Sequence, residues 1–249
     1  MKAKFNPKAK LFFQLGLCQE QAGKYDVAIA SLDKALLYQP DYADAWSLRG
    51  IMLGKLGQHQ EAITNFERAL SLRPDACWTW HNRGIALGKL GEYETAINSF
   101  DRAIEFNPDI STFWHNQGIT FINWGCYQKA VNCFERTLKL QPDSYWAWYN
   151  QGKAFLRLRH HEEALNSFDR AIEFKPDFFI AWHNRGIALS ARGHYEKAIT
   201  SLNRAIEINP NSQPAWYNKG IVLEKLGRYL QAIACFDRST VLAKMNPMI

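Results

Sequence analysis

Five asparagines recur at a fixed spacing and are the strongest candidates for chemistry in this chain of 249 residues. Consecutive members of this set are separated by the same number of residues throughout. An amide carries hydrogen-bond donors and an acceptor together, so a row of amides can pair with the N–H and C=O groups of an extended peptide whatever its sequence. The alternative is that each asparagine bonds to the neighbouring helix. The asparagine ladder, as we name this set, consists of Asn82, Asn116, Asn150, Asn184 and Asn218.

Motifs for catalysis or cofactor binding are missing from the sequence. The Gly-Lys pairs that begin at Gly54 and Gly88 lack the glycine spacing and the following Ser or Thr of a phosphate-binding loop. No metalloprotease helix, nucleophile elbow or dinucleotide-binding glycine pattern is present. His81, His115 and His183 fall on one face of successive helices, about 8–10 Å apart, which is too far for them to share a metal ion. We therefore expect no enzyme, no cofactor and no metal site, and interpret the histidines as contact residues.

The elements that position these residues follow from a period that runs through the chain. Proline recurs at one constant interval from Pro40 through Pro74 to Pro210, and columns of glycine, alanine and aromatic residues recur with it. A fixed period of this length indicates stacked units whose apolar faces are buried by their neighbours. A short basic segment, 1-8, precedes the units and a tail, 247-249, follows them. The seven predicted units are 9-42, 43-76, 77-110, 111-144, 145-178, 179-212 and 213-246.

Each unit is predicted to be a pair of antiparallel helices. In 77-110, Trp80 and Leu87 share one stripe of a first helix, whereas Asn82 falls on the opposite stripe. Gly91 then breaks the pattern and can adopt the positive φ of a tight turn before a second helical stripe begins. In the fifth unit Arg159 stands where the other turns have glycine. A left-handed residue with a side chain costs about 1–2 kcal/mol.

These columns resemble the tetratricopeptide repeat family, whose signature runs Trp, Gly, an aromatic residue or leucine, Ala, Phe, Ala and Pro over a period of about 34 residues. The resemblance covers 9-246 and is of the bacterial type. It implies an all-α, right-handed superhelical α-solenoid of seven helix-turn-helix units, and members of this kind bind peptides through such asparagines. The chaperone-tail-binding members hold a carboxylate with cations, and here His81, His115, Asn82 and Asn116 stand at several of those positions. Recognition of chaperone C-termini is therefore not expected.

Anchoring side chains must supplement the ladder if it binds a peptide. At about 0.5–1.5 kcal/mol per net hydrogen bond, five amides contribute at most about 7 kcal/mol, whereas micromolar binding needs about 8. Aromatic side chains and isoleucines on the same face are the expected anchors. Cations on this face outnumber acids, so we expect an acidic or carboxylate-bearing ligand. Besides the asparagines and histidines, the predicted groove residues are Trp78, Trp146, Tyr149, Tyr217, Ile85, Ile119, Ile187, Ile221, Lys55, Lys89, Arg157 and Lys225.

Composition narrows the classes of partner. The formal charge is +6, but the arginine column of the second helices, such as Arg102, alternates with acids such as Asp101, which argues against a nucleic-acid surface. The uncharged stretch 110-128 is too polar for a membrane span. An odd number of cysteines, five, without a C-x-x-C pair predicts a reducing, cytoplasmic environment.

The leading hypothesis is a scaffold or adaptor that captures an extended segment of a protein partner in a concave groove. A second hypothesis is self-assembly, because only three residues follow the last predicted unit and its final helix, with Val241 and Leu242, lacks a polar cap. That end could form a homodimer. A regulatory module of a larger effector system is a further alternative. RNA reading is disfavoured because the asparagines are uniform and a code requires varied residues.

Overall fold

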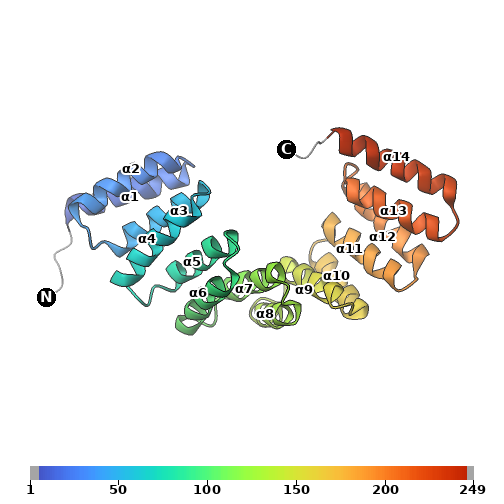
Figure 1. Ribbon diagram of the computed structural model, residues 1–249, viewed down its shortest axis with the longest axis horizontal. Coiled ribbons are helices and arrows are strands. Elements are labelled where there is room, and N and C mark those ends of the chain that lie inside the picture. The colour runs from blue at the N-terminus through green and yellow to red at the C-terminus, as the bar shows by residue number, and fades with distance from the viewer. Residues whose placement is uncertain (1–5, 246–249) are drawn as a thin grey trace. The chain divides into compact units, whose positions relative to one another are not determined.

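The computed structural model describes residues 6–245, which form helices joined by short turns and contain no strand (Figure 1). The chain divides into two compact units, here named unit 1 (1-124) and unit 2 (125-249). The helices of unit 1 are α1 (Pro7–Gln21), α2 (Tyr25–Tyr38), α3 (Ala43–Lys55), α4 (His59–Leu72), α5 (Cys77–Lys89), α6 (Tyr93–Phe106) and α7 (Ser111–Trp124). Those of unit 2 are α8 (Tyr127–Leu140), α9 (Tyr145–Arg157), α10 (His161–Phe174), α11 (Phe179–Ala191), α12 (Tyr195–Ile208), α13 (Gln213–Lys225) and α14 (Tyr229–Met245).

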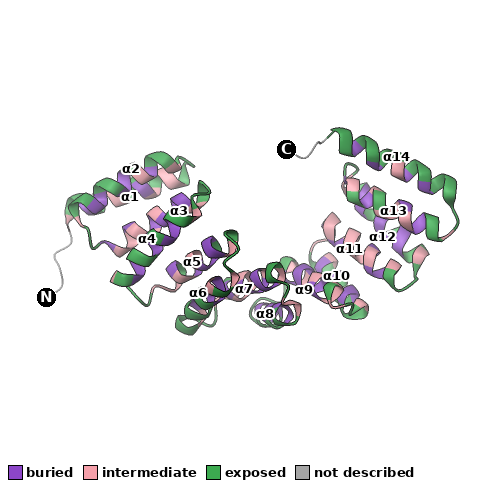
Figure 2. Ribbon diagram, viewed as in Figure 1, coloured by how far each residue is buried: buried purple, intermediate pink, exposed green. Residues whose placement is uncertain are grey.

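Both units are stacks of paired helices. Within a pair the two helices pack along their length, and the second helix also packs on the first helix of the following pair. Each helix carries buried residues on one side and exposed residues on the other (Figure 2). The predicted all-α fold of helix-turn-helix units is therefore confirmed within unit 1 and within unit 2. The boundary at Trp124 divides the predicted fourth unit, 111-144, so that α7 belongs to unit 1 and α8 to unit 2.

The turns inside the pairs have the predicted left-handed residue. Gly91 has φ +80°, and Gly23, Gly57 and Gly193 are similar. Arg159 has φ +61° at the equivalent position and is the one positive-φ residue other than glycine among residues 6–245. The strain expected at this turn is therefore present.

The glycine column lets the two helices of a pair approach closely. A Cβ atom added to Gly84 of α5 would lie 2.9 Å from the Phe100 ring of α6. The same relation holds in unit 2 between Gly152 and Phe168, where the distance is 2.7 Å. These phenylalanine rings are fully buried, so small and large columns interlock.

The tryptophan column connects each helix pair to the turn that precedes it. The indole N–H of Trp80 donates to the carbonyl oxygen of Pro74 at 2.8 Å, and Trp148 does the same to Pro142 at 2.9 Å. The contact satisfies a polar group that the packed ring would otherwise bury. It explains why tryptophan and proline repeat together with one period.

Candidate functional site

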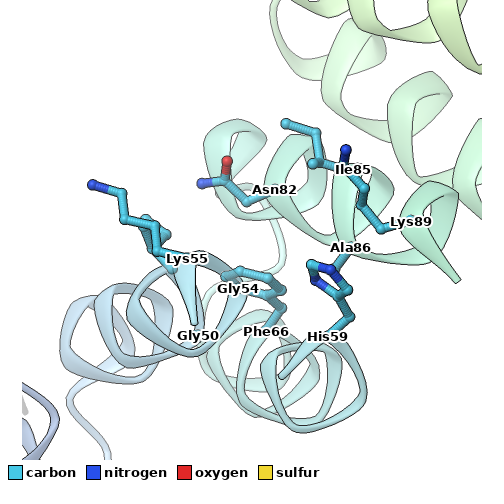
Figure 3. A pocket seen from close by; sticks show the side chains of 10 residues that line it. Gly50, Gly54, Lys55, His59, Phe66, Asn82, Ile85, Ala86 and Lys89 are labelled. Carbon is cyan, nitrogen blue, oxygen red and sulfur yellow. The ribbon is translucent and has the colours of Figure 1, made fainter. Parts of the chain in front are cut away.

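A first pocket opens between α3 and α5 of unit 1, with a volume of about 260 Å³. Gly50 and Gly54 of α3 form one side, while Asn82, Ile85 and Lys89 follow the other side along α5 (Figure 3). Gly54 creates the space, because a Cβ atom there would meet nothing within 4 Å. Its remaining lining includes Ile51 and Lys55 of α3 with His59 and Phe66 of α4.

A second pocket lies beside the first, between α5 and α7, and has a volume of about 230 Å³. Ile85 and Lys89 line both pockets and therefore form the wall between them. The far side of the second pocket carries Asn116, Ile119 and Thr120. Unit 1 thus has two adjoining pockets, each with isoleucine and asparagine in its lining.

A third pocket in unit 2 repeats this arrangement between α11 and α13, with a volume of about 190 Å³. Ile187, Asn218 and Lys225 line it at the columns that Ile51, Asn82 and Lys89 occupy in the first pocket. The recurrence shows that this hollow is a property of the repeat.

The asparagine ladder is largely used inside the protein, which differs from its expected role. The side-chain nitrogen of Asn116 lies 2.8 Å from Nε2 of His81 in the preceding pair, and Asn218 meets His183 in the same way at 2.8 Å. Asn184 donates to the carbonyl oxygen of Ile180. The alternative that the amides bond to neighbouring helices therefore holds for Asn116 and Asn218, whereas the bond from Asn184 to Ile180 lies within its own helix.

Three of the predicted groove residues are buried. His81 is 4% exposed, Tyr149 8% and Asn150 7%. His81 packs against the ring of Trp78, and Tyr149 packs against the ring of Trp146. This burial differs from their expected role, because it leaves these side chains little surface with which to contact a peptide. Asn82, Asn116 and Asn218 are half-buried and line pockets.

The histidines are neutral packing groups. Burial lowers the pKa of His81 to about 4. Burial also lowers the pKa of His115 and of His183, and in His183 a backbone hydrogen bond to Pro214 acts in the opposite direction. A neutral ring can accept the amide hydrogen of Asn116, which is consistent with the short contact to His81.

Aromatic side chains lie at the beginning of the odd-numbered helices. Trp78 of α5 is 52% exposed and packs edge-on against Phe113 with a centroid distance of 4.8 Å. Trp146 of α9 is exposed too and packs on Phe178 at 4.8 Å. Tyr217 of α13 is also exposed. These three side chains are therefore accessible at the position that the sequence predicts.

The predicted cations lie at the ends of the same helices. Nζ of Lys55 is 2.6 Å from Oε1 of Glu20, so its charge is already balanced. Lys89, Arg157 and Lys225 are exposed, and none of these three forms an ion pair within residues 6–245. Lys89 alone of the three borders two pockets.

Several residues that line the first pocket were not predicted from the sequence, among them Ile51 and His59. Ile51 lies one period before Ile85, so the repeat could have identified it. His59 comes from the second helix of its pair, which the helical-face argument did not consider.

Among residues 6–245, no three His, Cys, Asp or Glu side chains are arranged to hold a metal ion. No helix within that range has both the length and the apolar composition of a membrane span.

Comparisons with known proteins agree with the helix pairs. Among solved structures, the chain is similar to a tetratricopeptide repeat protein from Parabacteroides merdae, with 18% identity, a TM-score of 0.74 and coverage of 95% of this chain and 94% of the other. It is similar to PilW, a type IV pilus biogenesis factor, with 21% identity, a TM-score of 0.75 and coverage of 84% and 97%. YrrB, a TPR protein with an unusual peptide-binding site, is 21% identical with a TM-score of 0.65 and coverage of 76% and 97%. At these identities the likeness shows the fold alone.

No curated protein matches the sequence. Tetratricopeptide repeat models match residues 9–42, 41–109, 115–177, 167–200, 188–227 and 213–243. These matches span nearly all the described helices, and the paired helices, glycine turns and interlocking columns agree with them. The chain therefore belongs to the tetratricopeptide repeat family.

Proposed function

We propose that this protein is a non-catalytic scaffold that captures an extended segment of a protein partner on its odd-numbered helices. The observation that carries the proposal is the pair of adjoining pockets in unit 1, with apolar isoleucine walls and amides beside them. An apolar hollow with a few polar groups is the usual form of a ligand site. YrrB, which has the same fold, has a peptide-binding site.

The proposed ligand is acidic. Lys89 borders both pockets, and neither pocket lining contains an aspartate or a glutamate. An acidic segment would therefore meet a cation and no opposing charge at this place. The contribution of Lys55 is smaller than expected because Glu20 already neutralises it.

The test is selection of peptides from a displayed random library on the immobilised protein. We expect the selected peptides to combine acidic and aliphatic residues. They should lose at least about tenfold in affinity on Ile85→Glu, because this change places a repelling charge in the wall shared by both pockets. Their affinity should also fall as salt is raised.

The matched control is Thr64→Ala, at an exposed position of α4 outside all three pockets. It should bind the selected peptides as the unchanged protein does. Peptides that bind equally well to Ile85→Glu, or a library that yields no binder, would contradict the proposal.

Self-assembly is the second candidate. Ile233 of α14 is 54% exposed, whereas its counterpart Ile199 is buried. Leu230 is exposed as well. A mass that rises with concentration in light scattering, and that Ile233→Glu returns to the monomer value, would support a dimer through α14. Residues 247-249, which were part of this prediction, lie outside the described residues.

The cytoplasmic location stays a prediction. Cys18, Cys77, Cys126 and Cys235 carry free thiols, which agrees with a reducing environment. We propose no nucleic-acid or membrane partner.

A further inference from the structure

The two adjoining pockets of unit 1 set a spacing for the ligand. This inference rests on the proposed function and specifies which segment the site would take. We propose that the ligand is an acidic segment in the polyproline II conformation with an aliphatic side chain at every third residue, seated in successive pockets.

We infer that the two pockets are about one helix spacing apart. The first pocket lies between α3 and α5 and the second between α5 and α7, so a ligand that passes from one to the other crosses α5 alone. Helix α3 contacts α5, and α5 contacts α7. Packed helices are about 8–10 Å apart.

Polyproline II matches this distance. It rises about 3.1 Å per residue with three residues per turn, so residues i and i+3 point to one side about 9.3 Å apart. In a β-strand, residues on one side recur every two residues, about 6.7 Å, or every four, about 13 Å. The first distance is too short and the second too long.

An α-helical ligand fits less well. Its residues i and i+7 are about 10.5 Å apart, but i+3 and i+4 project from the same face between them. Those side chains would meet Ile85, which forms the wall between the pockets. A polyproline II segment places no side chain on that face between i and i+3.

Charge specifies the intervening residues. Lys89 borders both pockets, so its ammonium group lies beside the stretch of ligand that crosses α5. Residue i+1 or i+2 is therefore acidic. Asn82 in the first pocket offers its amide to the backbone of the same segment, which polyproline II leaves without internal hydrogen bonds.

The experiment uses labelled peptides with a proline- and glutamate-rich host sequence and two leucines separated by two, three, four or seven positions. Affinities for the full chain are measured by fluorescence anisotropy. We expect the peptide with leucines at i and i+3 to bind about tenfold more tightly than the others, because only this spacing seats both side chains. Replacing its glutamates by lysines should abolish most of the binding.

Two variants locate the effect. Ile85→Ala removes the wall between the pockets from an exposed position and should reduce the preference for the i+3 spacing to less than about threefold. Lys89→Glu should invert the preference between glutamate- and lysine-containing peptides. Thr64→Ala should change neither.

The outcomes separate this inference from the proposed function. Equal affinity at all spacings, or a preference for two, four or seven positions, would overturn the inference while leaving a peptide-binding scaffold. If no peptide of the set binds and the library selection also yields no binder, both are overturned.

Discussion

Unit 1 and unit 2 satisfy the asparagine ladder with different partners. In unit 1 Asn116 meets the imidazole of His81, and in unit 2 Asn218 meets His183. At the position equivalent to His81, unit 2 also has Tyr149. Burial raises the pKa of Tyr149, although a hydrogen bond with Asn184 acts in the opposite direction. Either ring therefore serves as a partner, and at these three asparagines the bond connects successive pairs of helices.

The isoleucine column differs more between the units. Ile51, Ile85 and Ile119 form one column along unit 1. In unit 2 the same column begins with Lys153 and continues with isoleucines. Burial, with the nearby charge of Arg157, lowers the pKa of Lys153. A row of apolar hollows is thus complete in unit 1, whereas a cation interrupts the column in unit 2, and specificity is expected to lie in this column.

The largest effect should come from acid. The folded-state pKa of His81, about 4, lies below its ordinary value of 6.5, so the unfolded chain binds the proton first as the pH falls. The stability from the neutral ring is fully present above pH 6.5 and is lost as the pH falls through about 4. We expect His81→Gln to remove about 3 kcal/mol of the loss in unfolding free energy between pH 7 and pH 4. Urea unfolding followed by circular dichroism at each pH measures this.

The control for this prediction is Tyr149→Phe, the equivalent position in unit 2, which has no group that titrates in this range. Its pH dependence should match that of the unchanged protein. Hydrogen exchange should place the acid-dependent opening caused by His81 in unit 1. If the unfolding free energy of His81→Gln depends on pH in the same way as that of the unchanged protein, then His81 does not cause the loss of stability in acid and the prediction is wrong.

A smaller effect is expected from the glycine column, where the units should behave in the same way. Gly84→Ala in unit 1 and Gly152→Ala in unit 2 should each lower the unfolding free energy by about 1–3 kcal/mol, because the added Cβ atom strikes a buried phenylalanine ring. Gly88→Ala, one turn after Gly84, meets only Thr120 at 3.6 Å and should raise stability by about 0.5–1 kcal/mol. Thermal unfolding compares the three. A destabilised Gly88→Ala would show that the Cβ argument is wrong.

The smallest effect is expected at the turns. Arg159→Gly in unit 2 should raise stability by about 0.5–1 kcal/mol, since it relieves a left-handed residue while adding freedom to the unfolded chain. The reverse change, Gly91→Arg in unit 1, should lower stability by about 1–2 kcal/mol. Shifts of opposite sign in the urea midpoint are expected. If Arg159→Gly lowers the midpoint, a contact of the arginine side chain outweighs the strain.

Much of the fold could be predicted because repeats contact only their neighbours. The period placed each helix pair, Gly91 marked a left-handed turn, and Arg159 marked the strained one. The tryptophan to proline hydrogen bond was not foreseen, although both columns were visible, because nothing in a helical pattern says that Trp80 reaches back six residues to Pro74. The division into two units was not foreseen either.

The candidate site was less predictable. Helical periodicity correctly grouped Asn82, Ile85 and Lys89 on one face, and all three line the first pocket. It could not tell that Asn150 is buried or that Glu20 neutralises Lys55 across 35 residues of sequence. Exposure depends on which side chains of the adjacent pair close over a position, and those vary from one repeat to the next.

The amino-acid sequence by itself determined the repeat, the helix pairs and their turns. It also determined which face of each first helix is not packed against the second helix of its pair. Local geometry suffices for these, since the positions of one helix follow from 100° per residue and from glycine and proline. Only the tertiary structure decided how that face is divided between packing and open pockets. The decision requires contacts between side chains about 35 residues apart, such as His81 with Asn116, whose partners are chosen by shape and hydrogen bonding in three dimensions.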